Sequence, residues 1–302
     1  MIYDCVIVGS GPAGLTAGIY LARANKTVAI LEKHSFGGQV TEIGEIENYP
    51  GFLNISGTDL SMNMYKQAKS LGVKFIAQEA LSYEFSDEIK KIKTNGGEIE
   101  AKAVILALGS IARKLNIENE KRLIGKGVSY CAVCDGNFFR GKTVAVIGSG
   151  DSAVSNAQYL SNIASKVYLI SKYNPMRLRN AKMEEVEELK NVELILEGKT
   201  LSILGEDRVE ALEVEQNGKI KNIKVDGVFV SIGRNPDTEN LKNLLQLDEK
   251  GYIIADGEMK TSKEGVFVAG DIVSGSVKQI VTAASLGAIA SESALKYLSL
   301  KK

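Results

Sequence analysis

The sequence contains little cysteine or histidine, with three cysteines and one histidine, His34, in 302 residues. Three cysteines are too few for the disulfide framework of a secreted domain, and in a reducing compartment a close pair is more often catalytic or metal-binding than structural. A structural zinc site needs about four ligands. Outside the pair Cys131 and Cys134, only Cys5, in a predicted strand, and His34 remain, so we expect no bound metal.

The sequence also lacks net charge and long apolar segments. Lysine plus arginine and aspartate plus glutamate each number 37, so we expect no general attraction to nucleic acid or to an anionic membrane. No apolar run approaches the roughly 18 residues of a membrane span, and Asp4 lies where a signal peptide would be positively charged. These absences predict a cytoplasmic protein that binds neither nucleic acid nor membrane.

One βαβ pattern occurs twice in the sequence. Residues 3–8 predict a buried strand, and after GSGPAG a helical pattern that includes Leu15 and Ile19 leads to a second strand at 27–32. Residues 143–170 repeat this plan as TVAVIG, SGDSA, a helical stretch and KVYLIS. Such units form parallel sheets with right-handed crossovers.

Antiparallel strands are predicted beside both units. Residues 81–105 contain the turn Gly96-Gly97, and residues 201–232 contain the turn Asn217-Gly218 before a buried strand. The expected fold class is therefore α/β, with two Rossmann-like, three-layer (ββα/βαβ) dinucleotide-binding domains.

The first glycine loop has the pattern GxGxxG between a predicted strand and a predicted helix. Gly9, Gly11 and Gly14 would allow a tight turn and the close approach of a pyrophosphate to the helix N-terminus. Pro12 suits the first helical turn, where its missing N–H costs nothing. Glu32, at the end of the next strand, is placed to accept the ribose hydroxyls of an adenosine. The alternative is a tight turn that binds no ligand.

The second glycine loop, GSGDSA, is weaker evidence for a nucleotide. Gly148 and Gly150 are present, and Ala153 is small enough for close packing of helix on strand. An NAD site would place an acid after the second strand, and an NADP site would place arginines there. The basic residues of this segment would either meet a 2′-phosphate or form a solvated surface. The segment contains Ser171, Lys172 and Tyr173, with Arg177 and Arg179 further on.

The stretch CAVCDG sets Cys131 and Cys134 three positions apart and follows them with Asp135. A static disulfide here would close only a very short loop and stabilise little, whereas a CxxC dithiol beside a dinucleotide fold can cycle. Redox exchange is therefore the best interpretation. Asp135 would either exchange the proton that thiolate formation requires or cap a turn, and its spacing does not separate the two roles.

These motifs together resemble the low-molecular-weight, flavin-dependent thioredoxin reductases along nearly the whole chain. The resemblance implies an FAD-binding domain formed by residues 1–111 and 236–302, and an inserted domain at 112–235 that carries the CxxC pair and the second glycine loop. It also implies a homodimer, with thioredoxin as the acceptor. The motifs that carry it are GSGPAG (9–14), GGQ (37–39), ENYPG (47–51), ALG (107–109), CAVCDG (131–136), GSGDSA (148–153), SIGRNP (231–236), GVFVAGD (265–271) and KQ (278–279).

The resemblance assigns roles to individual residues. Asp135 inherits the role of an acid beside the redox-active cysteines Cys131 and Cys134. The FAD site implied by the matching motifs consists of Gly9, Gly11, Pro12, Ala13, Gly14, Glu32, Gln39, Asn48, Gly109, Gly270, Asp271 and Gln279.

The departures from the family concern the electron donor. NADPH-dependent members read HRRxxxR where this chain reads SKYNPMR, and they read GGGxxAxEE where this chain has Ser155 and Asn156 in place of the two acids. Losing an arginine fork removes charge-assisted hydrogen bonds of about 1.5–3 kcal/mol each. We therefore expect reduced ferredoxin, used by a pyridine-nucleotide-independent branch, to be the donor.

Two alternatives stay open. The remnants Gly148, Gly150, Lys172 and Arg177 would still serve NADPH in an otherwise identical reductase. A non-enzymatic flavin and dithiol redox sensor would also explain the eroded nucleotide motif, and it would show no multiple turnover. For the enzyme, we expect the inserted domain to rotate about its linkers near residues 112 and 235, because the cysteines must meet the flavin in one state and the partner in another.

Overall fold

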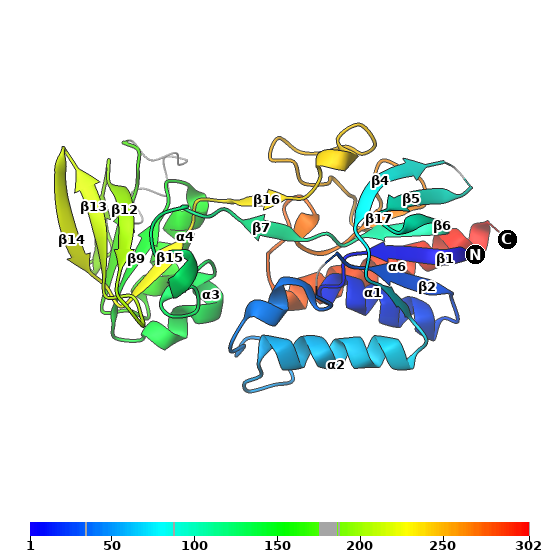
Figure 1. The fold of residues 1–302 in the computed structure, drawn as a ribbon, viewed down its shortest axis with the longest axis horizontal. Helices are drawn as coiled ribbons and strands as arrows, with labels where there is room; N and C mark the ends of the chain where they lie inside the picture. Colours follow the sequence, from blue (N-terminus) through cyan, green and yellow to red (C-terminus); the bar gives the residue numbers. More distant parts are fainter. Residues whose placement is uncertain (34, 87, 175–185, 187, 302) are drawn as a thin grey trace. The chain divides into compact units, whose positions relative to one another are not determined.

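The structure is a computed structural model that describes residues 1–33, 35–86, 88–174, 186 and 188–301 (Figure 1). The chain divides into two compact units. Unit 1 contains Met1–Ile111 and Asn235–Lys302, and unit 2 contains Ala112–Arg234. Unit 2 is thus inserted into unit 1, and residue 235, which the sequence prediction placed in the insert, belongs to unit 1.

Unit 1 is built on a seven-stranded sheet with the order β3-β2-β1-β6-β5-β4, in which β17 also pairs with β6. Strands β1, β2, β3, β6 and β17 are parallel, whereas β5 pairs antiparallel with β6 and β4 pairs antiparallel with β5. Val8, Leu31, Leu106 and Val268 lie in register, so β1, β2, β6 and β17 end at one edge. The strands are β1 (Ile2–Val8), β2 (Val28–Leu31), β3 (Lys74–Ile76), β4 (Ala80–Phe85), β5 (Lys90–Thr94), β6 (Gly97–Leu106) and β17 (Val266–Val268).

The helices of unit 1 are α1 (Pro12–Arg23), α2 (Gly57–Ser70) and α6 (Ile280–Leu300), with the 3-10 turns η1 (Gly38–Glu42), η4 (Glu239–Leu241) and η5 (Gly270–Ile272). Helix α1 begins at Pro12 and buries Leu15 and Leu21 completely. Helix α6 packs closely on α1, because a Cβ on Gly287 would lie 2.2 Å from the carbonyl oxygen of Ala13. This close packing fixes the start of α1 at the edge where the parallel strands end.

Unit 2 contains a five-stranded parallel sheet with the order β11-β10-β9-β15-β8 and a three-stranded antiparallel sheet β12-β13-β14. The hairpin between β13 and β14 turns at Asn217-Gly218, as the sequence predicts. The elements are β8 (Val128–Ser129), β9 (Thr143–Ile147), β10 (Lys166–Ile170), β11 (Val192–Ile195), β12 (Lys199–Leu204), β13 (Ala211–Gln216), β14 (Lys219–Lys224), β15 (Gly227–Val230), α3 (Ala132–Asp135), α4 (Asp151–Ser161), η2 (Lys121–Leu123) and η3 (Gly136–Phe139).

The two faces of the parallel sheet in unit 2 have separate cores. Along β9, Val144 and Val146 pack with α4, whereas Ala145 and Ile147 pack with the antiparallel sheet. Successive side chains of a strand point to opposite faces, so a strand buried on both sides is apolar throughout. Unit 2 therefore has three layers, and the α/β prediction is confirmed.

Two short strands join the units. Strand β7 (Ser110–Ala112) pairs with β16 (Arg234–Pro236), and the amide of Arg113 donates to the carbonyl of Gly233 at 2.9 Å. Both crossings of the chain between the units therefore lie in one two-stranded sheet.

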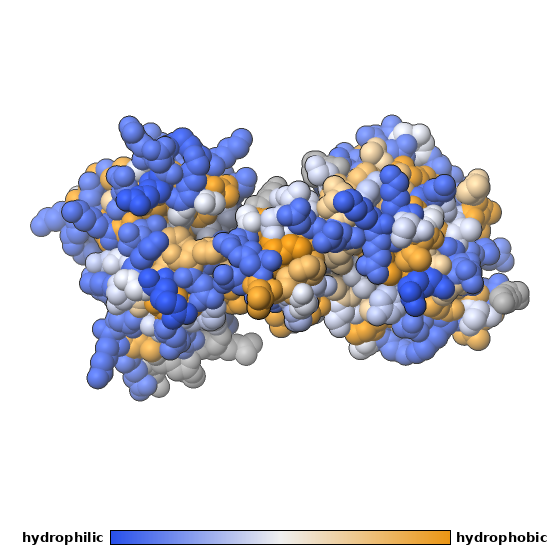
Figure 2. Space-filling view, turned by 90° about the horizontal axis from the view of Figure 1, so that it is seen from below, coloured by the Kyte–Doolittle hydropathy of each residue, from blue (hydrophilic) through white to orange (hydrophobic). Residues whose placement is uncertain are grey.

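Hydrophilic residues cover most of the visible face of each unit in Figure 2. In the part of the chain that the structure describes, no helix has the length and apolar character needed to cross a membrane.

Candidate functional site

The two predicted redox cysteines form a disulfide. Cys131 and Cys134 are bonded, with their Cα atoms 5.3 Å apart. Strand β8 ends at Ser129, and the short helix α3 begins after Cys131, whose Sγ accepts a hydrogen bond from the amide of Cys134 at 3.2 Å. Both cysteines are half-buried. The pair thus follows directly from a sheet strand and keeps some access to solvent.

The glycine after the motif lets α3 lie close to α4. A Cβ on Gly136 would lie 3.1 Å from side-chain atoms of Leu160 and Tyr159. Separations of this size are tighter than ordinary van der Waals contact, so a larger residue would push the disulfide segment away from α4.

Asp135 lies in a half-buried position at the end of α3. Its Oδ2 accepts a hydrogen bond of 2.6 Å from the Ser129 hydroxyl. Burial raises the pKa of Asp135 above the ordinary aspartate value, and the hydrogen bond from Ser129 acts in the opposite direction. A carboxyl group with a raised pKa holds its proton closer to neutral pH, which suits acid or base chemistry beside a thiol.

A second buried carboxylate supports the segment before the cysteines. Glu120 is only 3% exposed and accepts hydrogen bonds from the amides of Leu115 and Asn116, at 2.8 and 2.7 Å, and from the Tyr130 hydroxyl at 2.9 Å. Burial and the Glu120 carboxylate both raise the pKa of Tyr130, so its hydroxyl remains a donor. The sequence analysis did not identify Glu120, Tyr130 or Ser129, because no spacing pattern separates them from other polar residues.

The first glycine loop requires glycine at two positions and leaves room at a third. A Cβ on Gly9, which has φ +107°, would lie 2.2 Å from the Ala107 carbonyl oxygen. A Cβ on Gly14 would lie 1.9 Å from the Gly9 carbonyl oxygen, whereas a Cβ on Gly11 would meet nothing within 4 Å. The open backbone at Gly11 is the place where a pyrophosphate can approach the N-terminus of α1.

Glu32 lies beside this loop, one residue after β2. Its Oε2 accepts hydrogen bonds from the amide and the hydroxyl of Ser10, at 3.0 and 2.7 Å. The carboxylate is thereby fixed at the loop, in the position from which an acid can accept ribose hydroxyls.

The other predicted FAD contacts gather at the same edge of the unit 1 sheet. A Cβ on Gly38 would lie 3.1 Å from the Cα of Gly11, and the neighbouring Gln39 donates through Nε2 to the Ser110 carbonyl at 3.0 Å. Gly109 adopts φ +71°, and a Cβ there would lie 3.5 Å from the Gln39 Nε2. The loops at 37–39 and 107–110 are thus brought to the glycine loop.

Three further predicted FAD contacts lie on η5 and at the start of α6. A Cβ on Gly270 would lie 2.9 Å from the Cβ of Ala13, which places Asp271 next to the start of α1. Gln279 occupies the N-cap position of α6, and its side-chain Oε1 accepts a hydrogen bond of 3.2 Å from the Asn48 Nδ2. The predicted residues therefore form one cradle, and its open glycine and fixed carboxylate suit an adenine dinucleotide.

The second glycine loop keeps the backbone design but lacks the acid. A Cβ on Gly148 would lie 2.3 Å from the Ser231 carbonyl oxygen, and Gly150 has open space around it. The fully buried Ser171 hydroxyl lies 2.9 Å from the Ser149 hydroxyl. Lys172 is exposed at the surface.

Two of the basic residues that the sequence analysis considered for the 2′-phosphate, Arg177 and Arg179, lie outside the described residues. Asn156, which stands where the family has an acid, donates through Nδ2 to the Ser231 hydroxyl at 2.7 Å.

The family model for pyridine nucleotide-disulphide oxidoreductases matches residues 3–287. The chain belongs to this family.

Relatives of this oxidoreductase include thioredoxin reductases from Borreliella burgdorferi and Bacillus subtilis. The first is 41% identical over 294 residues, which cover 96% of this chain and 90% of that protein. The second is 39% identical over 310 residues, covering 98% and 95%. The solved thioredoxin reductase of Streptococcus pyogenes MGAS5005 is 38% identical, covers 99% of both chains and superposes with a TM-score of 0.94. These matches confirm the resemblance to low-molecular-weight thioredoxin reductases.

A more distant solved structure concerns the electron donor. It is a ferredoxin-flavin thioredoxin reductase from Clostridium acetobutylicum, 30% identical, with a TM-score of 0.54 over 99% of this chain and 98% of that chain.

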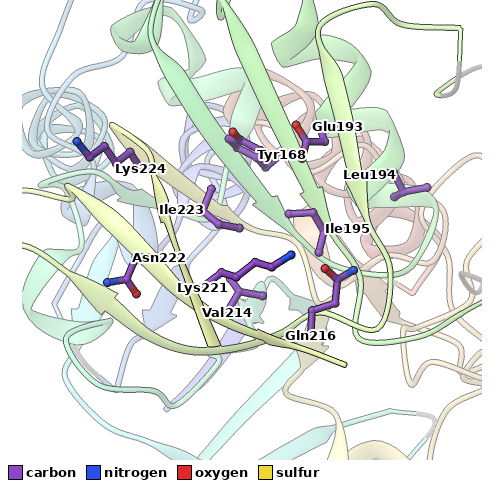
Figure 3. A pocket seen from close by; sticks show the side chains of 10 residues that line it. All are labelled: Tyr168, Glu193, Leu194, Ile195, Val214, Gln216, Lys221, Asn222, Ile223 and Lys224. Atoms are coloured by element: carbon purple, nitrogen blue, oxygen red, sulfur yellow. The ribbon is translucent and has the colours of Figure 1, made fainter. Parts of the chain in front are cut away.

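A pocket of about 300 Å³ lies in unit 2 (Figure 3). Its side chains come from β10 and β11 on one side and from β13 and β14 on the other. None of the predicted site residues lines it. The lining residues are Tyr168, Glu193, Leu194, Ile195, Val214, Gln216, Lys221, Asn222, Ile223 and Lys224.

Within the described ranges of the chain, no cluster of three or more histidine, cysteine, aspartate or glutamate side chains is arranged to hold a metal ion.

Proposed function

We propose that this oxidoreductase is a thioredoxin reductase that uses FAD and the Cys131–Cys134 pair, and that reduced ferredoxin supplies its electrons. The observation that carries the proposal is the disulfide beside the half-buried Asp135, in a chain with one complete and one incomplete dinucleotide loop. The relatives named above support thioredoxin as the acceptor.

The cradle of unit 1 would hold the FAD. Gly11 leaves its backbone open to the pyrophosphate, and Glu32 would accept the adenosine ribose hydroxyls. FAD held there would supply the electron pair needed to reduce the Cys131–Cys134 disulfide. Gln39, Asn48, Asp271 and Gln279 complete the proposed set of contacts, together with Gly9, Pro12, Ala13, Gly14, Gly109 and Gly270.

The reduced pair would act on thioredoxin by thiol-disulfide exchange. One thiolate attacks a sulfur of the thioredoxin disulfide, a mixed disulfide forms, and a thioredoxin thiolate leaves. The second cysteine then displaces thioredoxin, and the Cys131–Cys134 disulfide forms again. Asp135, with its raised pKa, would give a proton to a thiolate or take it back in these steps.

The proposed donor depends on a comparison between the two loops. At equivalent spacing, Ser10 meets the carboxylate of Glu32, whereas Ser149 meets only the hydroxyl of Ser171. A serine hydroxyl carries no charge and offers fewer acceptor positions to a ribose than a carboxylate does. The ferredoxin-flavin thioredoxin reductase among the solved relatives supports a donor other than a pyridine nucleotide.

A second candidate donor is NADPH. The close packing at Gly148 and the open backbone at Gly150 preserve a loop that can accept a pyrophosphate. Lys172 and Arg177 would then be the remaining contacts for the 2′-phosphate.

Anaerobic mixing of the oxidised protein with reduced ferredoxin, NADPH or NADH would separate these donors, with loss of flavin absorbance as the measurement. We expect fast bleaching by ferredoxin and slow or absent bleaching by both nucleotides, followed by multiple turnovers with thioredoxin. Rapid, saturable bleaching at micromolar NADPH would exclude the ferredoxin proposal. Failure of every donor to support repeated thioredoxin reduction would favour the non-enzymatic sensor.

A homodimer is part of the same proposal, because the family resemblance implies it. Light scattering of the purified chain would measure a mass of about twice 32.5 kDa if the proposal holds. A mass of one chain would contradict it.

A further inference from the structure

Ser129 connects the redox disulfide to the carboxyl group of Asp135. It is the last residue of β8 and is only 5% exposed. Its Oγ accepts a hydrogen bond of 3.0 Å from the Cys131 amide and lies 2.6 Å from the Asp135 Oδ2. The same Oγ lies 3.3 Å from the Cys131 carbonyl oxygen.

These distances give the hydroxyl two places to donate. A serine hydroxyl has one proton and two acceptor lone pairs. When Asp135 is ionised, the proton of Ser129 points to the carboxylate. When Asp135 carries a proton, the carboxyl group becomes the donor to Ser129, and Ser129 can turn its own proton to the Cys131 carbonyl.

We propose that Ser129 is a positioning residue for proton transfer at Asp135, reversing its hydrogen bond so that both protonation states of the carboxyl group keep a partner. The inference rests on the proposed function, in which Asp135 exchanges a proton with a cysteine sulfur. In that step the carboxyl O–H bond breaks and an S–H bond forms, and no oxidation state changes. Because an unpartnered buried group is costly, this partner lowers the cost of either state.

The strand holds Ser129 in place while the proton moves. Phe229 of β15 pairs with Ser129 in the parallel ladder, and the amide of Asp135 donates to the Cys131 carbonyl at 3.1 Å. The hydroxyl can therefore rotate without movement of the backbone.

The ionisable groups of the described residues near this site come from the segment before the cysteines and from α4. Tyr130 precedes Cys131, and α4, which packs on α3, carries Asp151 and Tyr159, while the two cysteines are joined in the disulfide. The causes of the raised pKa of Asp135 are burial and, acting against it, the hydrogen bond from Ser129. Removing this one hydroxyl should therefore change the titration of Asp135 directly.

The test compares Ser129→Ala and Ser129→Thr with the unchanged chain. Infrared spectroscopy of the oxidised holoprotein follows the protonated carboxyl band as pH changes, and Asp135→Asn identifies the band that belongs to Asp135. A charge-assisted hydrogen bond is about twice as strong as a neutral one, so we expect the alanine variant to raise the Asp135 midpoint by about one pH unit. Threonine keeps the hydroxyl and should restore the original midpoint. Ser165→Ala, at an exposed serine that donates to the Lys142 carbonyl, should leave the midpoint unchanged.

A second measurement connects the titration to the reaction. The photoreduced protein is mixed with oxidised thioredoxin at a series of pH values, which removes the electron donor from the experiment. In Ser129→Ala, the decrease of the rate at high pH should shift to higher pH together with the Asp135 midpoint. An unchanged infrared midpoint, or a midpoint that moves while the rate profile does not, would overturn the proposal. If the unchanged protein fails to reduce thioredoxin, the proposed function fails, while the infrared midpoints still decide whether Ser129 controls Asp135.

Discussion

We predict that restoring the arginine pair found after the second strand of the inserted domain in NADPH-dependent relatives would strengthen flavin reduction by NADPH. The variant Lys172→Arg/Tyr173→Arg would replace a lysine and a tyrosine at the surface of the loop beside Ser171. Ser171 is left unchanged, because its buried hydroxyl contacts the Ser149 hydroxyl and accepts a hydrogen bond of 3.1 Å from the Tyr173 amide. We expect the double variant to gain NADPH-dependent flavin reduction.

The size of the gain follows from the number and exposure of the new contacts. A hydrogen bond to a charged group contributes about 1.5–3 kcal/mol, and about 1.4 kcal/mol corresponds to a tenfold change in affinity. Tyr173 is 39% exposed and Lys172 is also exposed, so solvent screening favours the lower limit. Tyr173→Arg should therefore tighten NADPH binding about tenfold, and Lys172→Arg by less because the lysine already carries a charge, so the double variant should gain between about tenfold and about a hundredfold.

Stopped-flow measurement of flavin bleaching against nucleotide concentration would determine this gain. NADH lacks the 2′-phosphate, so its apparent affinity should change little in the same variant. Lys172→Gln serves as the opposite control and should weaken any NADPH binding that remains. An equal gain for NADH and NADPH, or no gain for either, would refute the assignment of this loop to the 2′-phosphate.

The remaining predictions concern the dithiol, the first glycine loop and the buried carboxylate. Cys131→Ser and Cys134→Ser should each abolish repeated reduction of thioredoxin but still bind FAD. One of the two variants should trap a mixed disulfide with thioredoxin, which mass spectrometry would detect. Substantial turnover in either variant would exclude the dithiol mechanism. Gly11→Ala should lose FAD affinity, but without FAD it should melt at the same temperature as the unchanged apoprotein. Gly14→Ala should also melt at a lower temperature, because its Cβ would lie 1.9 Å from a carbonyl oxygen. Equal melting temperatures of the two variants would contradict the distinction between an open and a packed glycine position. Glu120→Ala should lower the free energy of unfolding of unit 2 by about 3–5 kcal/mol, measured by denaturant unfolding, because two amides and a tyrosine hydroxyl lose their acceptor. A decrease below about 1 kcal/mol would show that water replaces the carboxylate.

The sequence predicted the strands and helices whose apolar residues recur at a regular spacing or that adjoin a glycine loop. The βαβ pattern at residues 3–32 becomes β1, α1 and β2, and the pattern at 143–170 becomes β9, α4 and β10. These segments are predictable because strand burial on two faces and the glycine turn are local properties of the chain. The hairpin at Asn217-Gly218 is local for the same reason.

Contacts between distant segments could not be predicted in this way. Asn48 and Gln279 are 231 positions apart, and they entered the predicted FAD site through the family resemblance. The pairing of β7 with β16 likewise joins the two segments at which the chain enters and leaves unit 2, which are far apart in the sequence. Ser129 is close to the cysteines in sequence, but its importance depends on the direction of one hydroxyl, which residue spacing does not encode.

The two glycine loops show which features the fold requires and which a ligand requires. In both units a serine inside the loop bonds to a residue 22 positions further on, at the end of the next strand. Glycine at the first loop position is also needed in both, because a Cβ on Gly9 or Gly148 would lie within 2.3 Å of a carbonyl oxygen. The serine partner differs, since it is a carboxylate in unit 1 and a hydroxyl in unit 2. Both partners satisfy the serine, so protein stability alone does not select the acid. The acid at Glu32 therefore points to a bound nucleotide in unit 1, and its absence in unit 2 is the reason to test ferredoxin first.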